Sequence, residues 1–187
     1  LLLASEEIIS ALFGYGSFNE SGVKNSARAL FYFSLGLPAF SLIKVFSSFF
    51  FARHNTKTPF YISLTSVLLN VLISIFYFKS IGFLIIPIAT SVSSWFNSVM
   101  LFVFLKKDNL FNFNLIFINR FIRIIIASAI MGFLFEYLIN FFDSYLKYDY
   151  NLKSAFLIGI VLLGLISYFL IAVLIKAFKI SDINLKY

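Results

Sequence analysis

The chain has 187 residues, of which 61% are hydrophobic and 12% charged, and its mean hydropathy is +0.97. Soluble domains carry about 25% charged residues, so the composition excludes a soluble enzyme or a soluble nucleic-acid-binding protein and indicates an integral membrane protein. The net charge of +7 is then a question of which loops hold the charge, and no nucleic acid is expected as a partner. The absence of cysteine excludes disulfides and thiolate metal sites.

The first segment, residues 1–18, is apolar but interrupted by Glu6, Glu7, Gly14 and Gly16. We expect residues 1–26 to form the end of a truncated helix and a periplasmic interfacial turn, because the apolar stretch is too broken for a full span. The chain opens on Leu1 without an initiator Met or a basic leader. We therefore expect no signal peptide and the C-terminal part of a longer protein.

Five apolar runs follow, each with about the 20 residues that a helix needs to cross the bilayer core. They predict an all-α polytopic membrane protein with five transmembrane helices at residues 27–51, 59–78, 82–105, 121–142 and 155–175. Thr58 and Pro59 are the predicted N-cap and first helical position of the second helix. The short polar turn at residues 79–82 predicts that the second and third helices are antiparallel neighbours.

Five antiparallel crossings place each loop charge on one of two sides. One side holds nine basic and two acidic residues, net +7, and the other holds five of each, net 0. The first set is Arg53, Lys57, Lys106, Lys107, Arg120, Arg123, Lys176, Lys179, Lys186, Asp108 and Asp182; the second is Lys24, Arg28, Lys79, Lys147, Lys153, Glu6, Glu7, Glu20, Asp143 and Asp149. By the positive-inside rule, the first side and the C-terminus are cytoplasmic.

Polar residues form a stripe along the first predicted span: Ser34, Ser41, Lys44 and Ser48 fall on one helical face. A cation in mid-span costs about 2.5–3.5 kcal/mol on insertion and usually faces a bundle interior or a hydrated cavity. The alternative is that the Lys44 stem extends toward the interface. We predict that Lys44, with Ser41 and Ser48, lines a cavity.

The next two spans carry similar stripes, which are Ser63, Ser66, Asn70, Ser74 and Tyr77, then Thr90, Ser91, Ser94, Asn97 and Ser98. Helix packing explains any single serine, because small polar residues let membrane helices approach and bond. Three coinciding stripes with a lysine favour a cavity wall that includes Asn70 and Asn97. In the first span, Gly36 and Pro38 predict a kink that serves as a hinge or is static. The last two spans have almost no polar stripe and are expected to contact lipid.

Most chemistry that enzymes use is missing. His54 is the sole histidine, which excludes a cluster of histidines around a metal, and its place in a basic turn does not suit a Ser-His-Asp set. The four aspartates, Asp108, Asp143, Asp149 and Asp182, do not form the close pairs that bind Mg-diphosphate in membrane prenyltransferases. We expect no cofactor, no metal and no catalytic residue, and therefore a transporter.

The turn between the first two spans and its flanks resemble the MurJ/MviN lipid II flippase family of the multidrug/oligosaccharidyl-lipid/polysaccharide exporter superfamily. The resemblance covers residues 10–70, with a looser match through residue 97. It is carried by residues 11–18 (ALFGYGSF), residues 35–40 (LGLPAF), Lys44-Val45 and above all residues 50–59 (FFARHNTKTP). This last block contains the cytoplasmic loop motif Arg53, Thr56, Lys57, Thr58 and Pro59.

The resemblance implies a fourteen-helix transporter of the bacterial inner membrane, with two six-helix lobes around a cavity and two further helices. Residues 27–105 would be three cavity-lining helices of the C-terminal lobe, and residues 106–187 the two additional helices and the cytoplasmic C-terminus. It implies lipid II as substrate, membrane lipids and the missing N-terminal lobe as partners, and Lys44 as a headgroup contact. The alternatives are another lipid-linked oligosaccharide or drug exporter of the superfamily, or a noncatalytic membrane scaffold.

Overall fold

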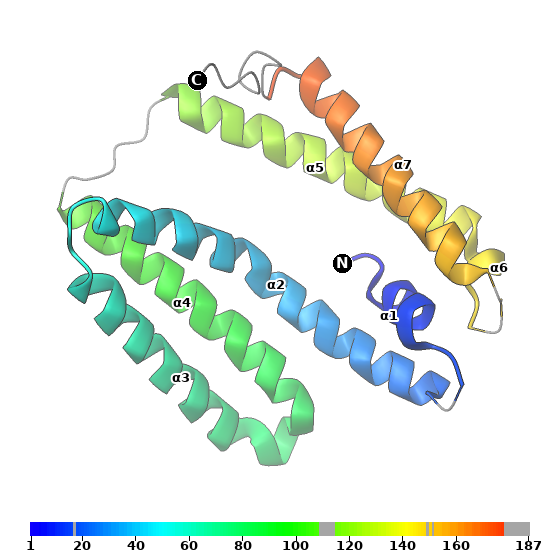
Figure 1. The fold of residues 1–187 in the computed structure, drawn as a ribbon, viewed down its shortest axis with the longest axis horizontal. Coiled ribbons are helices and arrows are strands. Elements are labelled where there is room, and N and C mark those ends of the chain that lie inside the picture. The colour runs from blue at the N-terminus through cyan, green and yellow to red at the C-terminus, as the bar shows by residue number, and fades with distance from the viewer. Residues whose placement is uncertain (17, 109–114, 149, 151, 178–187) are drawn as a thin grey trace. The chain divides into compact units, whose positions relative to one another are not determined.

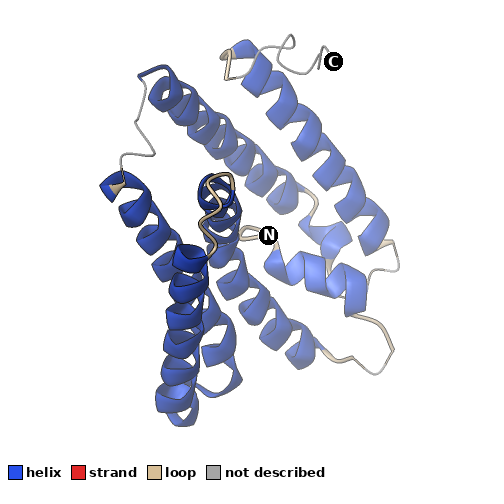
Figure 2. Cartoon of the chain, turned by 60° about the vertical axis from the view of Figure 1, so that its left-hand side comes forward, coloured by secondary structure: helices blue, strands red, loops and turns tan. Residues whose placement is uncertain are grey.

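The computed structural model of the chain describes residues 1–16, 18–108, 115–148, 150 and 152–177. All regular structure in these ranges is helical (Figures 1 and 2). The elements are α1 (Ser5–Phe13), α2 (Glu20–Phe51), α3 (Lys57–Ile81), the 3-10 turn η1 (Gly82–Leu84), α4 (Ile85–Lys107), α5 (Leu115–Phe141), α6 (Asp143–Leu146) and α7 (Lys153–Leu174).

Four stretches of the described residues are long and apolar enough to cross a membrane: Glu20–Phe51, Lys57–Lys107, Ile118–Phe141 and Lys153–Leu174. The second is 51 residues long and folds back at η1 into the antiparallel pair α3 and α4 (Figure 1). Each of these two helices has the length of a span, with 25 and 23 residues. The all-α polytopic fold with five apolar spans is therefore confirmed.

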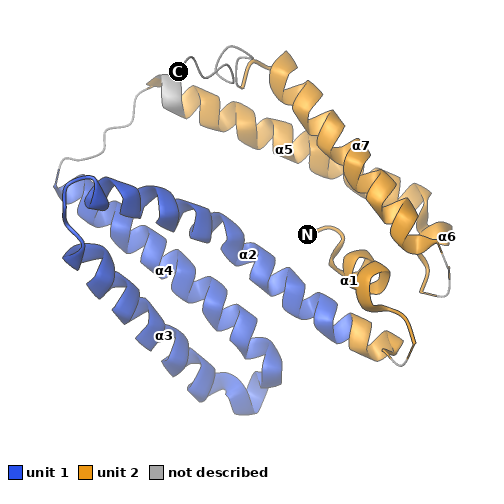
Figure 3. Ribbon diagram, in the orientation of Figure 1, with its two compact units in different colours: residues 1–2, 24–112 blue, residues 3–23, 113–187 orange. Residues whose placement is uncertain are grey.

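The helices form two compact units, shown in Figure 3, and each is described by itself. The first unit comprises residues 1–2 and 24–112, and the second comprises residues 3–23 and 113–187. The first thus contains most of α2 with α3 and α4, and the second contains α1, the first turn of α2, α5, α6 and α7.

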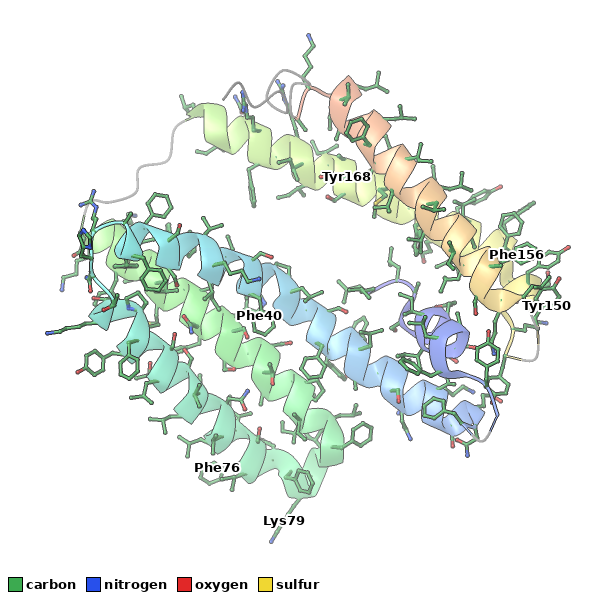
Figure 4. The ribbon with its side chains drawn as sticks, viewed as in Figure 1. Phe40, Phe76, Lys79, Tyr150, Phe156 and Tyr168 are labelled. Atoms are coloured by element: carbon green, nitrogen blue, oxygen red, sulfur yellow. The ribbon has the colours of Figure 1, made fainter. Side chains whose placement is uncertain are left out.

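In the first unit, α2, α3 and α4 share an apolar cluster near the end of α2. Phe46 and Phe50 of α2 pack with Ile62 of α3 and with Leu101 and Leu105 of α4. In a membrane such contacts stabilise by close packing, because lipid is as apolar as the cluster itself. Away from it, α3 presents a largely exposed apolar face that includes Phe76 (Figure 4).

A glycine and a proline mark the two ends of α3. Gly82 has a φ of 70°, which glycine adopts without strain, and it follows the end of α3. Residues 79–81 of the predicted turn belong to the helix, and the chain folds back at η1. The prediction for the start of α3 was wrong, because the helix begins at Lys57 and places Pro59 third. Proline is tolerated there, since N–H groups of the first turn have no partner within the helix.

In the second unit, α5 and α7 lie side by side (Figures 1 and 2) and pack through small residues. Ala127 of α5 and Ala172 of α7 are fully buried, and an added Cβ at Gly164 would lie 3.2 Å from the Phe135 ring. Where α7 begins, aromatic rings gather, and those of Tyr150 and Phe156 are centred 5.9 Å apart (Figure 4). This packing gives the apolar last two spans a defined interface.

Candidate substrate-binding face and helix seams

Lys44 and its two neighbouring serines lie on the surface of α2. Lys44, Ser41 and Ser48 are all exposed, whereas Ser34 of the same predicted stripe is buried. The hydroxyl groups of Ser41 and Ser48 donate to the backbone carbonyls of Leu37 and Val45 in their own helix. Because those hydrogens are used, the two serines offer acceptor lone pairs beside the ammonium donors of Lys44.

Asn70 lies in the seam between α3 and α4 and bonds across it. Its Nδ2 is 3.2 Å from Thr90 Oγ1 and 3.2 Å from Ser93 Oγ, so one amide bridges two residues of the facing helix. Ser93 was not part of the predicted stripe. Asn70 thus makes the helix-to-helix contact that the packing interpretation requires, and its predicted place in a cavity wall stays a prediction.

Asn97 occupies the same seam farther along α4 and is 8% exposed. Its Nδ2 reaches Ser63 Oγ of α3 at 3.4 Å, and no donor among the described residues reaches its buried Oδ1. The pairs Asn70–Thr90 and Ser63–Asn97 fix the antiparallel register of α3 and α4. The structure therefore brings Asn70 and Asn97 together along one seam and leaves Lys44 on a different helix.

In the predicted hinge region, α2 approaches α4 closely. A Cβ added at Gly36 would lie 2.8 Å from Ser91 Oγ and 3.1 Å from Ser91 Cα. Ser91 Oγ donates to the Tyr32 carbonyl at 2.5 Å, and Trp95 Nε1 donates to the Leu35 carbonyl at 3.0 Å. Gly36 thus permits backbone contact, and α2 continues through Pro38 without interruption; a hinge role stays a prediction.

The loop motif forms two linked caps between α2 and α3. His54 has a left-handed φ of 58°, and the amides of His54 and Asn55 bond to the carbonyls of Phe51 and Phe50, which is the Schellman pattern that ends helices. Asn55 Oδ1 then accepts from the Thr58 amide at 3.2 Å and its Nδ2 donates to Thr58 Oγ1 at 3.0 Å. The motif therefore holds the α2–α3 turn through Asn55, while Arg53, Thr56 and Lys57 are exposed.

Lys153 is a residue whose environment the sequence did not indicate. It was counted as a loop charge, but it is the first residue of α7 and is 1% exposed. Its Nζ donates to the carbonyls of Gly14 at 2.7 Å and Tyr148 at 2.6 Å. The same Nζ lies 4.3 Å and 4.5 Å from the ring centres of Tyr15 and Tyr148. Gly14 and Lys153 are far apart in the sequence, so the residues around Lys153 did not indicate that it is buried.

Known proteins resemble this chain along its length. The family model described as lipid II flippase MurJ matches residues 1–156. A probable lipid II flippase MurJ of Rhizobium tropici is 33% identical over 190 residues, covering 100% of this chain and 36% of the relative. A probable lipid II flippase MurJ of Thermotoga maritima is 33% identical over 183 residues, covering 98% of this chain and 35% of the relative. The chain thus spans about a third of the length of these relatives, and it belongs to the MurJ family of lipid II flippases.

Proposed function

We propose that this chain forms part of a flippase that moves the lipid-linked peptidoglycan precursor lipid II from the cytoplasmic to the outer leaflet of the bacterial inner membrane. Family membership along the whole chain is the observation that carries this proposal. Because the chain spans about a third of its relatives, it acts together with the N-terminal lobe of the same protein. No covalent step is needed, so the protein is a transporter and not an enzyme.

The transport mechanism is alternating access between two lobes. Lys44, flanked by Ser41 and Ser48 on the exposed face of α2, offsets the desolvation of the anionic headgroup and donates hydrogen bonds to it. Asn70 and Asn97 support this wall from the α3–α4 seam. Gly36 and Pro38 let α2 bend, and the apolar faces of α5 and α7 accommodate the polyprenyl tail.

The membrane orientation follows from the loop charges. The α2–α3 turn with Arg53, Thr56, Lys57, Thr58 and Pro59 lies in the cytoplasm, as does the C-terminus. Lys153 is buried, but it lies at the start of α7 and still counts on the outer side, so the two sides hold nine and five basic residues.

Complementation tests the function. We expect the chain, joined to the N-terminal lobe of a relative, to replace a depleted lipid II flippase. The Lys44→Ala variant should lower transport by about tenfold at equal membrane abundance, since a charged hydrogen bond is worth about 1.5–3 kcal/mol. Lys44→Arg should retain most activity, and Lys79→Ala, at the exposed end of α3, serves as the control.

The outcomes separate the substrate from the site. A well-inserted fusion that fails to rescue would contradict the lipid II assignment. Equal rescue by the parent fusion and by Lys44→Ala would keep the substrate and remove Lys44 from the headgroup site.

A further inference from the structure

The end of α1 lacks the usual means of closing a helix. The last carbonyls of a helix have no partner within it and carry the negative end of the helix dipole. A glycine in the left-handed conformation often closes such an end, but Gly14, the residue after α1, has a φ of −73°. Two carbonyls at this end, those of Ala11 and Gly14, instead bond to side chains from far along the chain.

Those side chains are the first two residues of α7. Ser154 Oγ donates to the Ala11 carbonyl at 2.6 Å and Lys153 Nζ donates to the Gly14 carbonyl at 2.7 Å. An ammonium group is unfavourable at the start of its own helix, where the dipole is positive. At the end of α1 the sign is reversed, so the Lys153 charge is placed where the field of the neighbouring helix favours it.

Aromatic side chains complete the enclosure. The Tyr15 hydroxyl is 2.6 Å from Ser154 Oγ, and the Tyr148 hydroxyl donates to the Phe18 carbonyl at 2.6 Å. The rings of Tyr15 and Tyr148 lie against Lys153 Nζ within cation–π distance. A cation that is 1% exposed is costly unless it is bonded, and here two carbonyls and two ring faces surround it.

We propose that Lys153 and Ser154 form an interhelical latch that caps α1 from α7 and makes α1, Gly14, Tyr15, Phe18 and the start of α7 one rigid body. Each contact joins residues 11–18 to residues 148–154 within the second unit. The α5–α7 pair therefore moves with α1 in any conformational change of the protein. The latch does not depend on the transported substrate.

Distance measurement between spin labels tests the latch in the full chain in lipid nanodiscs. Leu12 of α1 and Ile158 of α7 are 63% and 60% exposed, and the chain has no cysteine, so Leu12→Cys and Ile158→Cys take the labels uniquely. We expect a narrow distance distribution that widens about twofold in Lys153→Met, as expected when a bonded segment opens locally. The exposed Lys147 provides the control Lys147→Met, which should keep the narrow distribution.

A distribution in Lys153→Met as narrow as that of the parent would overturn the latch, as would a parent distribution already as broad as the variant's. If Lys153→Met does not insert, Ser154→Ala carries the test against Ser167→Ala, because the Ser167 hydroxyl donates within its own helix, to the Gly164 carbonyl. Widening in Ser154→Ala alone supports the latch, and equal widths in the two serine variants overturn it.

Discussion

The two units use polar side chains in opposite ways. In the first unit, amides and hydroxyls bond between helices in the middle of the apolar spans, as Asn70 does with Thr90 and Ser93. In the second unit, α5 and α7 meet through alanine, glycine and aromatic rings. The interhelical side-chain bonds described for α7 gather at its first residues, Lys153 and Ser154.

This difference bears on which helix surfaces are suited to contact water and which are suited to contact lipid. A polar seam in the middle of a span keeps its bonds whether a neighbouring surface contacts lipid or a hydrated cavity. An apolar pair such as α5 and α7 is suited to contact acyl chains along its length. Polar side chains bond to another helix at one end of the pair, where α7 begins. The contrast agrees with a proposed headgroup face on α2 and a proposed tail surface on α5 and α7.

The largest expected effect on stability concerns close backbone approach in the first unit. Gly36→Ala should destabilise the chain by about 2–3 kcal/mol, because the added Cβ would lie 2.8 Å from Ser91 Oγ, which is bonded to the Tyr32 carbonyl, and 3.1 Å from Ser91 Cα, which no side-chain rotation moves. Its matched control is Gly164→Ala, where the new Cβ lies 3.2 Å from a Phe135 ring atom and the ring can shift. Unfolding in mixed micelles measures the free energy of unfolding of both variants. An equal decrease for Gly36→Ala and Gly164→Ala would contradict a close approach of α2 and α4 at Gly36.

A smaller effect is expected in the polar seam. Asn70→Ala should lower stability by about 1 kcal/mol, since it removes two bonds between α3 and α4 while membrane hydrogen bonds average about 0.6 kcal/mol each. Thr65→Val on the same helix is the control, because Thr65 Oγ1 donates within α3, to the Ile62 carbonyl. The same unfolding assay measures both variants. If Asn70→Ala lowers the free energy of unfolding no more than Thr65→Val does, the bonds of Asn70 across the seam do not stabilise the fold.

The sequence predicted the parts of this molecule that depend on local pattern. Apolar runs of sufficient length gave the five spans, and the Lys79–Gly82 turn gave the α3–α4 pairing. The start of α3 was predicted wrongly because Asn55, not Thr58, accepts the bond from the first turn. The turn between α3 and α4 and the start of α3 both depend on contacts between residues that are only a few positions apart in the sequence.

Contacts between distant segments set the features that the sequence did not reveal. From the sequence, Lys153 was counted as a loop charge. It is buried because Gly14 and Tyr15, which are far away in the sequence, pack against it. Gly36 was interpreted as room for a kink, which stays a prediction; the structure adds that a Cβ there would lie 2.8 Å from Ser91 Oγ and 3.1 Å from Ser91 Cα of α4. The exposed position of Lys44 on α2 agrees with the predicted cavity.

Thiol labelling of Lys44→Cys tests whether the face of α2 that carries Lys44 is hydrated, since the chain has no cysteine of its own. A membrane-impermeant maleimide reacts with thiolate, which forms in water and not in lipid. In the full-length fusion we predict labelling about tenfold faster than at Ile166→Cys, an exposed position of α7, and slowing by added lipid II. Labelling of Lys44→Cys as slow as that of Ile166→Cys would contradict a hydrated headgroup site on α2.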